Sequence, residues 1–79
     1  MQEQLRKKLL YRSLHRGCKE TDLILGQFAE KHIDTMNDEE LKEFNNILNQ
    51  NDSDIVSWAM KREEPPTSLY GPVMKKLLS

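Results

Sequence analysis

Apolar residues along this chain recur mainly at spacings of three and four, which is the period of an α-helix rather than of a strand. In residues 2–15, Leu5 and Leu9 lie four residues apart, and so do Leu10 and Leu14. Each pair shares one side of a helix, so the spacing predicts a helix with two partly covered faces over this segment.

A glycine separates this first helix from a second one. Gly17 has no Cβ and accepts the left-handed backbone conformation with which many helices end. The second helix is predicted from about Lys19 to Ile33; Phe28 lies on its apolar stripe, which Leu23 is expected to widen. Gly26 lies inside it, where the missing side chain weakens the helix or lets another helix approach closely.

The third helix has the clearest start. Asn37 can cap it, and the side chain of Glu40, three residues later, can reach back to the amide of Asn37. Apolar residues then follow at helical spacing from Leu41 to Leu48. The polar run 49–51 is expected to end the helix, because its side chains compete for backbone hydrogen bonds.

Two more short helices complete the predicted fold. One opens at Asp52 and carries apolar residues as far as Met60, and the two prolines at 65–66 then require a loop. The other runs from Pro72 to Leu78, with the proline in its first turn. No segment shows strand-like alternation, so we predict an all-α fold, a compact bundle of about five short helices in a single domain over residues 1–79.

Length and composition narrow the class of protein. The chain has 79 residues, of which 37% are hydrophobic and 32% are charged. A domain of this size buries only about 60% of the surface of its unfolded chain, so a core and a deep catalytic cleft hardly fit together. We therefore expect a binding module and not an enzyme. No apolar run approaches the ~18 residues needed to cross a bilayer, so no direct membrane insertion is expected.

The net charge of −1 conceals an uneven distribution. Residues 1–19 carry six basic side chains and one acidic one, whereas residues 20–64 carry twelve acidic and four basic ones. The basic segment either meets an acidic partner or is a solvated face whose charges pair with the acidic remainder of the chain. A nucleic-acid partner is not expected, because the middle of the chain is acidic and only five residues are aromatic.

Few residues are suited to chemistry. His15 and Cys18 lie three apart, but a structural zinc site needs four ligands, and the chain has two histidines and one cysteine. Arg16 and Lys19 would lower the pKa of Cys18, yet no base is matched to it. We expect His15 to interact with the dipole of a helix C-terminus and Cys18 to be a small packing residue, with no metal bound.

Arg16, Gly17 and Glu20 form the most informative group. Arg16 offers a planar fork of donors that suits carboxylates or backbone carbonyls, and Glu20 offers acceptors one turn into the next helix. A partner could press against the bare Gly17 while engaging both charges. The same residues also fit an ordinary glycine helix stop between solvated charges, and taken alone they favour that simpler interpretation.

A wider pattern changes this weighting. The motif Arg16-Gly17-x-x-Glu20 is followed by Asp22-x-x-Leu25-x-x-Phe28, then by Leu41-x-x-Phe44-x-x-Ile47-Leu48, and finally by Asn51-Asp52-Ser53-Asp54-Ile55-x-x-Trp58. Together these motifs cover about residues 10–61. They resemble the family of succinate dehydrogenase FAD assembly factors, which are small flavinylation factors of bacteria and mitochondria.

The resemblance implies a five-helix bundle that is not itself an enzyme. It implies binding to the flavoprotein subunit of succinate dehydrogenase or fumarate reductase, and promotion of covalent attachment of FAD to a histidine of that subunit. The chain would bind no cofactor stably, would act on FAD held by the client, and would be a monomer when free. The client-binding residues carried over from the resemblance are Arg16, Gly17, Glu20, Asp52, Asp54 and Trp58.

Three of these residues keep a second interpretation. Asp52 and Asp54 are also the acidic first turn of a helix, where the helix dipole favours them. Trp58, the sole tryptophan, is as suited to a core as to a binding surface. Whether these three residues touch the client or hold the fold stays open.

Origin and rival functions complete the expectations. The chain opens at Met1 without the amphipathic, acid-poor leader of a mitochondrial precursor, so we expect a bacterial cytoplasmic protein. The alternative function is a generic protein-interaction adaptor, such as an antitoxin-like partner of a membrane or cytoskeletal protein. A nucleic-acid binder that uses the basic first helix is a third class.

Overall fold

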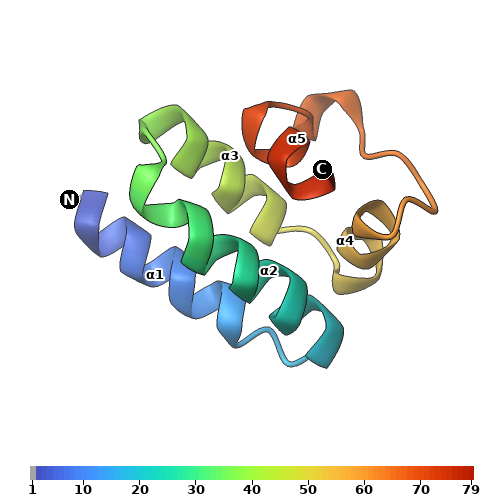
Figure 1. Cartoon of the computed structure of the whole chain (residues 1–79), viewed down its shortest axis with the longest axis horizontal. Coiled ribbons are helices and arrows are strands. Elements are labelled where there is room, and N and C mark those ends of the chain that lie inside the picture. The colour runs from blue at the N-terminus through green and yellow to red at the C-terminus, as the bar shows by residue number, and fades with distance from the viewer. Residues whose placement is uncertain (1) are drawn as a thin grey trace.

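The computed structural model describes residues 2–79 and forms an all-α fold (Figure 1). The α-helices are α1 (Gln2–Leu14), α2 (Lys19–His32), α3 (Asp38–Leu48), α4 (Asp52–Ala59) and α5 (Pro72–Leu78), and two short 3-10 helices are η1 (Ile33–Thr35) and η2 (Thr67–Leu69). No strand occurs in this part of the chain, so the prediction of about five short helices is confirmed. Met1, which the predicted domain includes, lies outside the described residues.

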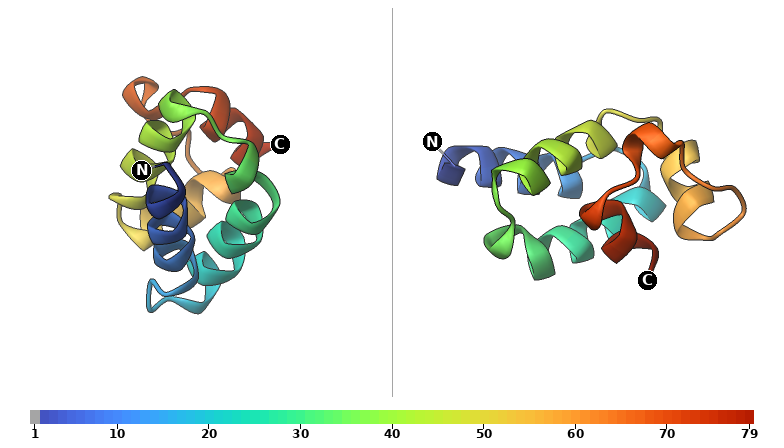
Figure 2. Two further views of the ribbon diagram at one scale, coloured as in Figure 1. Left: turned by 90° about the vertical axis from the view of Figure 1, so that its left-hand side faces the viewer. Right: turned by 90° about the horizontal axis from the view of Figure 1, so that it is seen from above.

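The helices α1 and α2 form an antiparallel hairpin that the views from three directions all show (Figures 1 and 2). Leu14 at the end of α1 lies over Gly26, and a Cβ atom at position 26 would be 2.6 Å from the Leu14 Cδ2 atom. Gly26 therefore lets α1 approach α2 closely, which is one of the two roles predicted for it. The remaining helices pack around this hairpin, with α3 against α1 and α5, and α4 against α2.

Each α-helix contributes to one core. Its fully buried side chains include Leu9 from α1, Leu25 from α2, Phe44 from α3, Ile55 from α4 and Met74 from α5. Burial of side chains of this size supplies most of the favourable free energy of folding in a small domain. Within residues 2–79, no helix is both long and apolar enough to cross a membrane.

One predicted core position is wrong. Leu23 was expected to widen the apolar stripe of α2, but this residue is 59% exposed. Leu25, two positions later, is fully buried. Two positions correspond to a rotation of roughly 200° around a helix, so Leu23 and Leu25 occupy nearly opposite sides of α2.

The predicted capping box of α3 is confirmed. The backbone amide of Glu40 donates to the Asn37 side-chain oxygen at 2.9 Å, and the amide of Asn37 donates to Glu40 Oε1 at 3.0 Å. The helix ends at Leu48, directly before the polar run that was expected to stop it.

The basic first helix separates its arginines from its lysines. Arg6 donates from Nε to the carbonyl of Ile33 at 3.1 Å and also binds the carbonyl of Met36. Arg12 donates to the side-chain oxygens of Asn45 in α3 and of Asn49, the residue that caps the end of α3. Lys7 and Lys8, in contrast, are exposed. The arginines of this segment therefore bind within the fold, mostly to carbonyl and amide oxygens rather than to acidic groups. The lysines are the basic residues that stay accessible to a partner.

A carboxylate of α3 attaches the last helix. The backbone amide of Met74, in the first turn of α5, donates to Glu43 Oε2 at 2.8 Å. A carboxylate at a helix N-terminus satisfies an unpaired amide and interacts favourably with the dipole. Val73 and Met74 are buried beside it. Polar capping and apolar burial thus fix α5 on α3 together.

The helix α4 ends with a residue in an unfavourable backbone conformation. Lys61 has φ +60°, its amide donates to the Trp58 carbonyl at 3.0 Å, and the amide of Arg62 donates to the Ser57 carbonyl at 2.8 Å. These two bonds form the Schellman motif, in which glycine is the preferred residue at the left-handed position.

We expect Lys61→Gly to raise the free energy of unfolding by about 0.5–1 kcal/mol, because glycine adopts the left-handed conformation without a Cβ penalty. Urea unfolding followed by circular dichroism measures the change. Arg62→Gly is the matched control and is expected to be neutral or slightly destabilising, since it only adds freedom to the unfolded chain. Equal stabilities of the two variants would contradict the prediction.

Candidate functional site

The α1–α2 turn carries the first motif. Between Leu14 and Lys19 the chain reverses through Gly17, which has φ +88°. The backbone amide of Arg16 donates to Asp22 Oδ1 at 2.7 Å, so the first turn of α2 holds the turn that precedes it. A Cβ atom at Gly17 would meet nothing within 4 Å. The tip of the turn is therefore bare and open to solvent, and the predicted left-handed glycine is confirmed.

Arg16 connects this turn to the junction of α3 and α4. Its Nη1 atom donates to the Leu48 carbonyl at 2.6 Å, and its Nη2 atom donates to the Gln50 carbonyl at 2.7 Å. Its Nε atom lies 2.6 Å from Asp52 Oδ1 and forms a salt bridge with it. The guanidinium thus binds the last carbonyl of α3, one carbonyl of the α3–α4 connection and the carboxylate that opens α4. We name this set of contacts the Arg16 clasp.

The contacts of the clasp are largely shielded from solvent. The Arg16 side chain is 12% exposed and the Asp52 side chain 31% exposed, so solvent screens the pair less than it screens a surface pair. The C-terminal carbonyls of α3 add negative potential on the other side of the guanidinium. Arginine suits this position because its rigid fork can address three acceptors at once, whereas lysine is a single point charge.

The clasp brings the two sequence motifs together. Arg16 belongs to the first motif and Asp52 to the second, and 36 residues separate them along the chain. The sequence predicted the chemistry of Arg16, a donor fork for carboxylates or carbonyls, but the acceptors that it finds belong to this chain. Arg16 and Asp52 therefore lie beneath the turn and determine its position.

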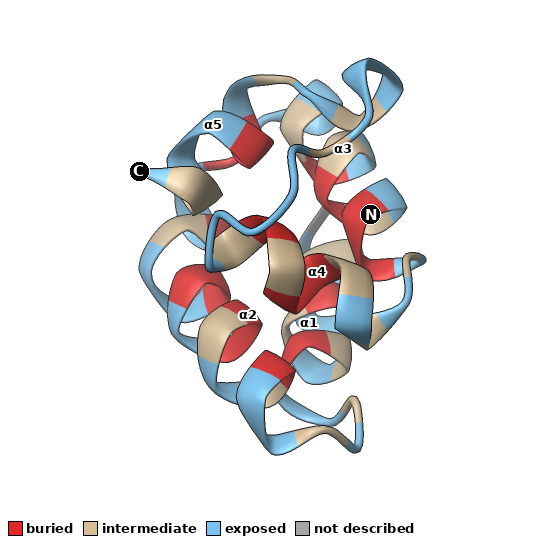
Figure 3. Ribbon diagram, turned by 90° about the vertical axis from the view of Figure 1, so that its right-hand side faces the viewer, coloured by how far each residue is buried: buried red, intermediate tan, exposed pale blue. Residues whose placement is uncertain are grey.

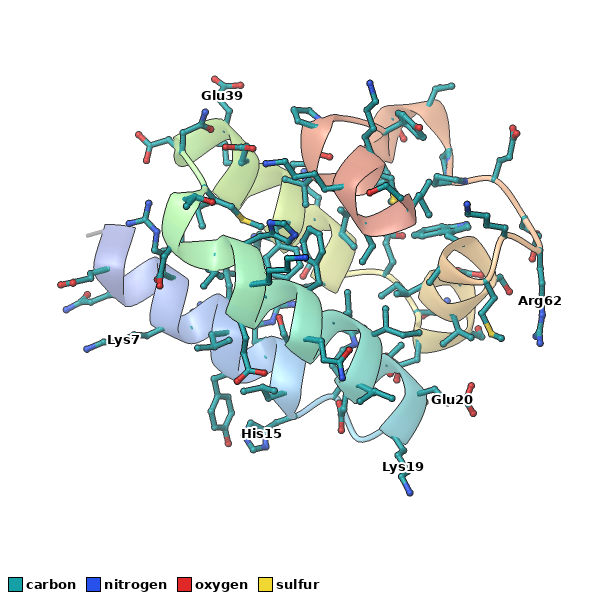
Figure 4. All side chains as sticks on the ribbon, viewed as in Figure 1. Lys7, His15, Lys19, Glu20, Glu39 and Arg62 are labelled. Carbon is teal, nitrogen blue, oxygen red and sulfur yellow. The ribbon has the colours of Figure 1, made fainter. Side chains whose placement is uncertain are left out.

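The other predicted site residues divide between surface and core. Glu20 is exposed and points away from the body of the protein beside Lys19 (Figure 4). Asp54, in the first turn of α4, is half-buried. Trp58 is 6% exposed and belongs to the core. Gly17 and Glu20 are the two most exposed residues of the predicted site, and the turn that carries Gly17 is largely exposed (Figure 3). That any of the predicted site residues contacts a client stays a prediction.

Cys18 lies at the N-cap of α2, next to the clasp. The Thr21 side chain and the backbone amides of the first turn lower the pKa of the Cys18 thiol, while desolvation and the charge of Asp52 oppose the shift. The Thr21 hydroxyl also donates to the Cys18 carbonyl at 3.1 Å. The sequence attributed such a lowering to neighbouring cations and thus missed Thr21. Residues 2–79 contain no cluster of three or more metal-ligating side chains around Cys18 or elsewhere. His15 stacks on Tyr11 with ring centroids 4.2 Å apart.

Three residues contribute to the site in ways that the sequence did not predict. Asp22 was recognised from the sequence only as part of the family motif, yet its carboxylate also accepts a hydrogen bond from the Arg16 amide. The carbonyls of Leu48 and Gln50 accept from Arg16, and a backbone carbonyl is the same group at every residue. Only the packing of α1 against α3 determines that these two carbonyls lie next to Arg16.

The model of a family described as "Flavinator of succinate dehydrogenase" matches residues 7–79. A Dictyostelium discoideum protein named "Succinate dehydrogenase assembly factor 2, mitochondrial" is 44% identical over 73 residues, which cover 92% of this chain and 52% of the relative. Proteins of the same name from Cryptococcus neoformans (42% over 74 residues, 92% and 42% covered) and Saccharomyces cerevisiae (50% over 56 residues, 71% and 35% covered) are also similar. The chain spans about half or less of the length of these relatives.

The relatives overturn the expected origin. They are eukaryotic proteins and are named mitochondrial, so the prediction of a bacterial cytoplasmic protein is wrong. That prediction relied on the composition of the first residues. The helical segment shared with the relatives accounts for half or less of their length, so its composition is no guide to compartment.

We expect Arg16→Ala to lower the free energy of unfolding by about 2 kcal/mol, because two carbonyls and the Asp52 carboxylate lose their partner in a partly buried place. Arg16→Lys should recover less than half of this loss, since one ammonium cannot reach three acceptors in fixed directions. Chemical denaturation measures both changes. The exposed Arg62→Ala is the control, with an expected change within 0.5 kcal/mol. An Arg16→Ala variant as stable as the control would refute the clasp.

The lowered pKa of Cys18 predicts faster alkylation at neutral pH than an unperturbed thiol would show, because the thiolate is the reacting species. Thr21→Val removes the hydroxyl, so its alkylation rate should reach half of its maximum at a higher pH. Thr21→Ser keeps the hydroxyl and should retain the wild-type pH profile. Iodoacetamide labelling followed by mass spectrometry from pH 6 to pH 10 measures the three profiles, and coincident wild-type and Thr21→Val profiles would contradict the assignment.

Proposed function

The chain belongs to the family of flavinators of succinate dehydrogenase, and on that premise we propose that it binds the flavoprotein subunit of succinate dehydrogenase and promotes the covalent attachment of FAD to it. The named relatives are succinate dehydrogenase assembly factors. The observation that carries the proposal is the bare turn at Gly17 and Glu20, fixed from beneath by the Arg16 clasp.

A fixed turn favours tight docking because little conformational entropy is lost on binding. Arg16 engages three acceptors and Asp22 holds the Arg16 amide, so the backbone around Gly17 is ordered before a partner arrives. The missing side chain at Gly17 lets a partner backbone or a flat surface reach the turn. Glu20 then supplies a carboxylate for a basic group on the client. Arg16 and Asp52 act as positioning residues in this scheme.

The proposed role is that of a binding protein and not of an enzyme. The client holds the FAD non-covalently, and this chain binds no cofactor stably. Preferential binding to the client conformation in which the flavin and the acceptor histidine are aligned raises the population of that conformation. Alignment of two reacting groups alone can lower a barrier by several kcal/mol.

All reacting groups of the covalent step, including the electron acceptor, belong to the client. A bond between a methyl carbon of the isoalloxazine and a ring nitrogen of the histidine replaces one C–H and one N–H bond. Two electrons are released together with two protons, and the isoalloxazine itself accepts the electrons. The product is the attached flavin in its two-electron reduced form. This chain contributes the arrangement of the client and no reacting group.

The finer points of partner choice are part of the same proposal. The flavoprotein subunit of fumarate reductase, which the family resemblance also implies, is a second expected client. The free chain is expected to be a monomer, and neither nucleic acid nor a membrane is an expected partner. The family membership favours this function over a generic adaptor.

We expect Gly17→Arg to weaken binding to the FAD-loaded flavoprotein subunit at least tenfold, because a large side chain would fill the contact point. The open space around the glycine lets the substituted protein fold. Isothermal titration calorimetry measures the affinity, and in-gel flavin fluorescence of the subunit measures covalent FAD.

Gly17→Ala separates bulk from backbone strain. Both variants carry the cost of a side chain at φ +88°, on the order of 1 kcal/mol, but only arginine adds bulk at the tip. The alanine variant should keep binding within threefold of the wild type. Unchanged affinity of Gly17→Arg, or normal covalent flavin in cells that lack this protein, would overturn the proposed function.

A further inference from the structure

A groove with exposed apolar walls runs beside the proposed docking turn. It lies between α2 and α4 and is closed at one end by α5. Leu23 on α2 and Met60 at the end of α4 form its walls, with 59% and 55% of their surface exposed. Ile24 and Leu77, both half-buried, extend the apolar lining. Large apolar side chains gathered in one groove are typical of a binding surface, whereas single exposed ones are not.

The groove continues the surface of the turn, since Glu20 lines both. From Glu20 the groove follows α2 to Lys31, which lies eleven positions later and is also exposed. Eleven residues of α-helix span about 16 Å, or three turns. A partner that contacts Gly17 and Glu20 therefore lies at the entrance of the groove.

The two ends of the groove carry opposite charges. Glu20 is acidic, and the basic Lys31 lies at the other end of the α2 wall. Lys76 of α5 also lines the groove, but its ammonium group forms a salt bridge with Glu40 at 3.6 Å. An α-helix has the complementary polarity, because its N-terminus carries a partial positive charge and its C-terminus a partial negative one. An apolar groove of this length with charges of this order suits an amphipathic helix laid along it.

We propose that this groove binds an amphipathic α-helix of about three turns that belongs to the client flavoprotein, with the helix N-terminus near Glu20 and its C-terminus near Lys31. The inference rests on the proposed function. The apolar side of the helix packs between Leu23 and Met60, and the flexible Met60 side chain adapts to its shape. The turn at Gly17 and this groove then form one continuous docking surface with two separable parts.

The test compares substitutions in the two parts of that surface. Leu23→Asp combined with Met60→Asp should weaken binding to the FAD-loaded flavoprotein subunit at least tenfold in calorimetry, because both walls become charged. Lys31→Glu should weaken binding about threefold. Tyr11→Ser is the control, because Tyr11 is 65% exposed and lies outside the groove. It should bind like the wild type, and thermal unfolding verifies that every variant is folded.

A photo-crosslinking residue at position 23 then identifies the occupant by mass spectrometry. Crosslinks to a client segment with apolar residues at helical spacing support the proposal. Crosslinks mainly to a second copy of this chain, or to a non-helical client segment, overturn it.

The failure of this inference can be told apart from failure of the proposed function. If Gly17→Arg abolishes binding while the double aspartate variant binds like the wild type, the groove proposal fails and the proposed function stands. If the wild-type protein does not bind the flavoprotein subunit at all, the proposed function fails and the groove proposal fails with it.

Discussion

The arrangement of this small bundle depends on the contacts of one group, the guanidinium of Arg16. It satisfies the Leu48 and Gln50 carbonyls and pairs with Asp52, so a single side chain links the α1–α2 turn to the α3–α4 junction. The last carbonyls of a helix lack intrahelical partners, and in a chain of this size few other donors can reach them. The same contact fixes the turn that carries Gly17. Stability and the geometry of the docking surface therefore have a common origin.

The arginines and lysines of α1 lie in different environments because their side chains differ chemically. Arg6 and Arg12 also donate to oxygen atoms on other segments, while lysines of the same helix stay exposed. A guanidinium keeps several directed donors and loses less hydration than an ammonium when it is partly buried. The basic first helix therefore contributes arginines to the internal framework and leaves lysines for solvent or for a partner. The acid Glu20 lies exposed next to this framework, and in the proposed function it binds a basic group of the client.

Features that depend on neighbouring residues were predicted correctly, whereas contacts between residues far apart in the sequence were not. The capping box at Asn37 and the left-handed Gly17 depend on a few neighbouring residues, and both were predicted correctly. The donor chemistry of Arg16 was also anticipated, but its acceptors 32 to 36 residues away were not. Leu23 was misplaced because apolar character alone does not reveal which side of α2 faces the core. The expected bacterial cytoplasmic origin, which was drawn from the composition of the first residues, was wrong, because the relatives are eukaryotic proteins named mitochondrial.

The sequence by itself determined the helices, their ends and the motifs that place the chain in its family, because periodicity, capping and turn residues act over one or two helical turns. Only the tertiary structure decided which motif residues face inward. Arg16, Asp52 and Trp58 are held within the fold, whereas Gly17 and Glu20 remain at the surface. The physical reason is that burial and pairing of a side chain depend on which distant segments pack beside it. A charged residue looks the same in a sequence whether its partner is this chain or another protein.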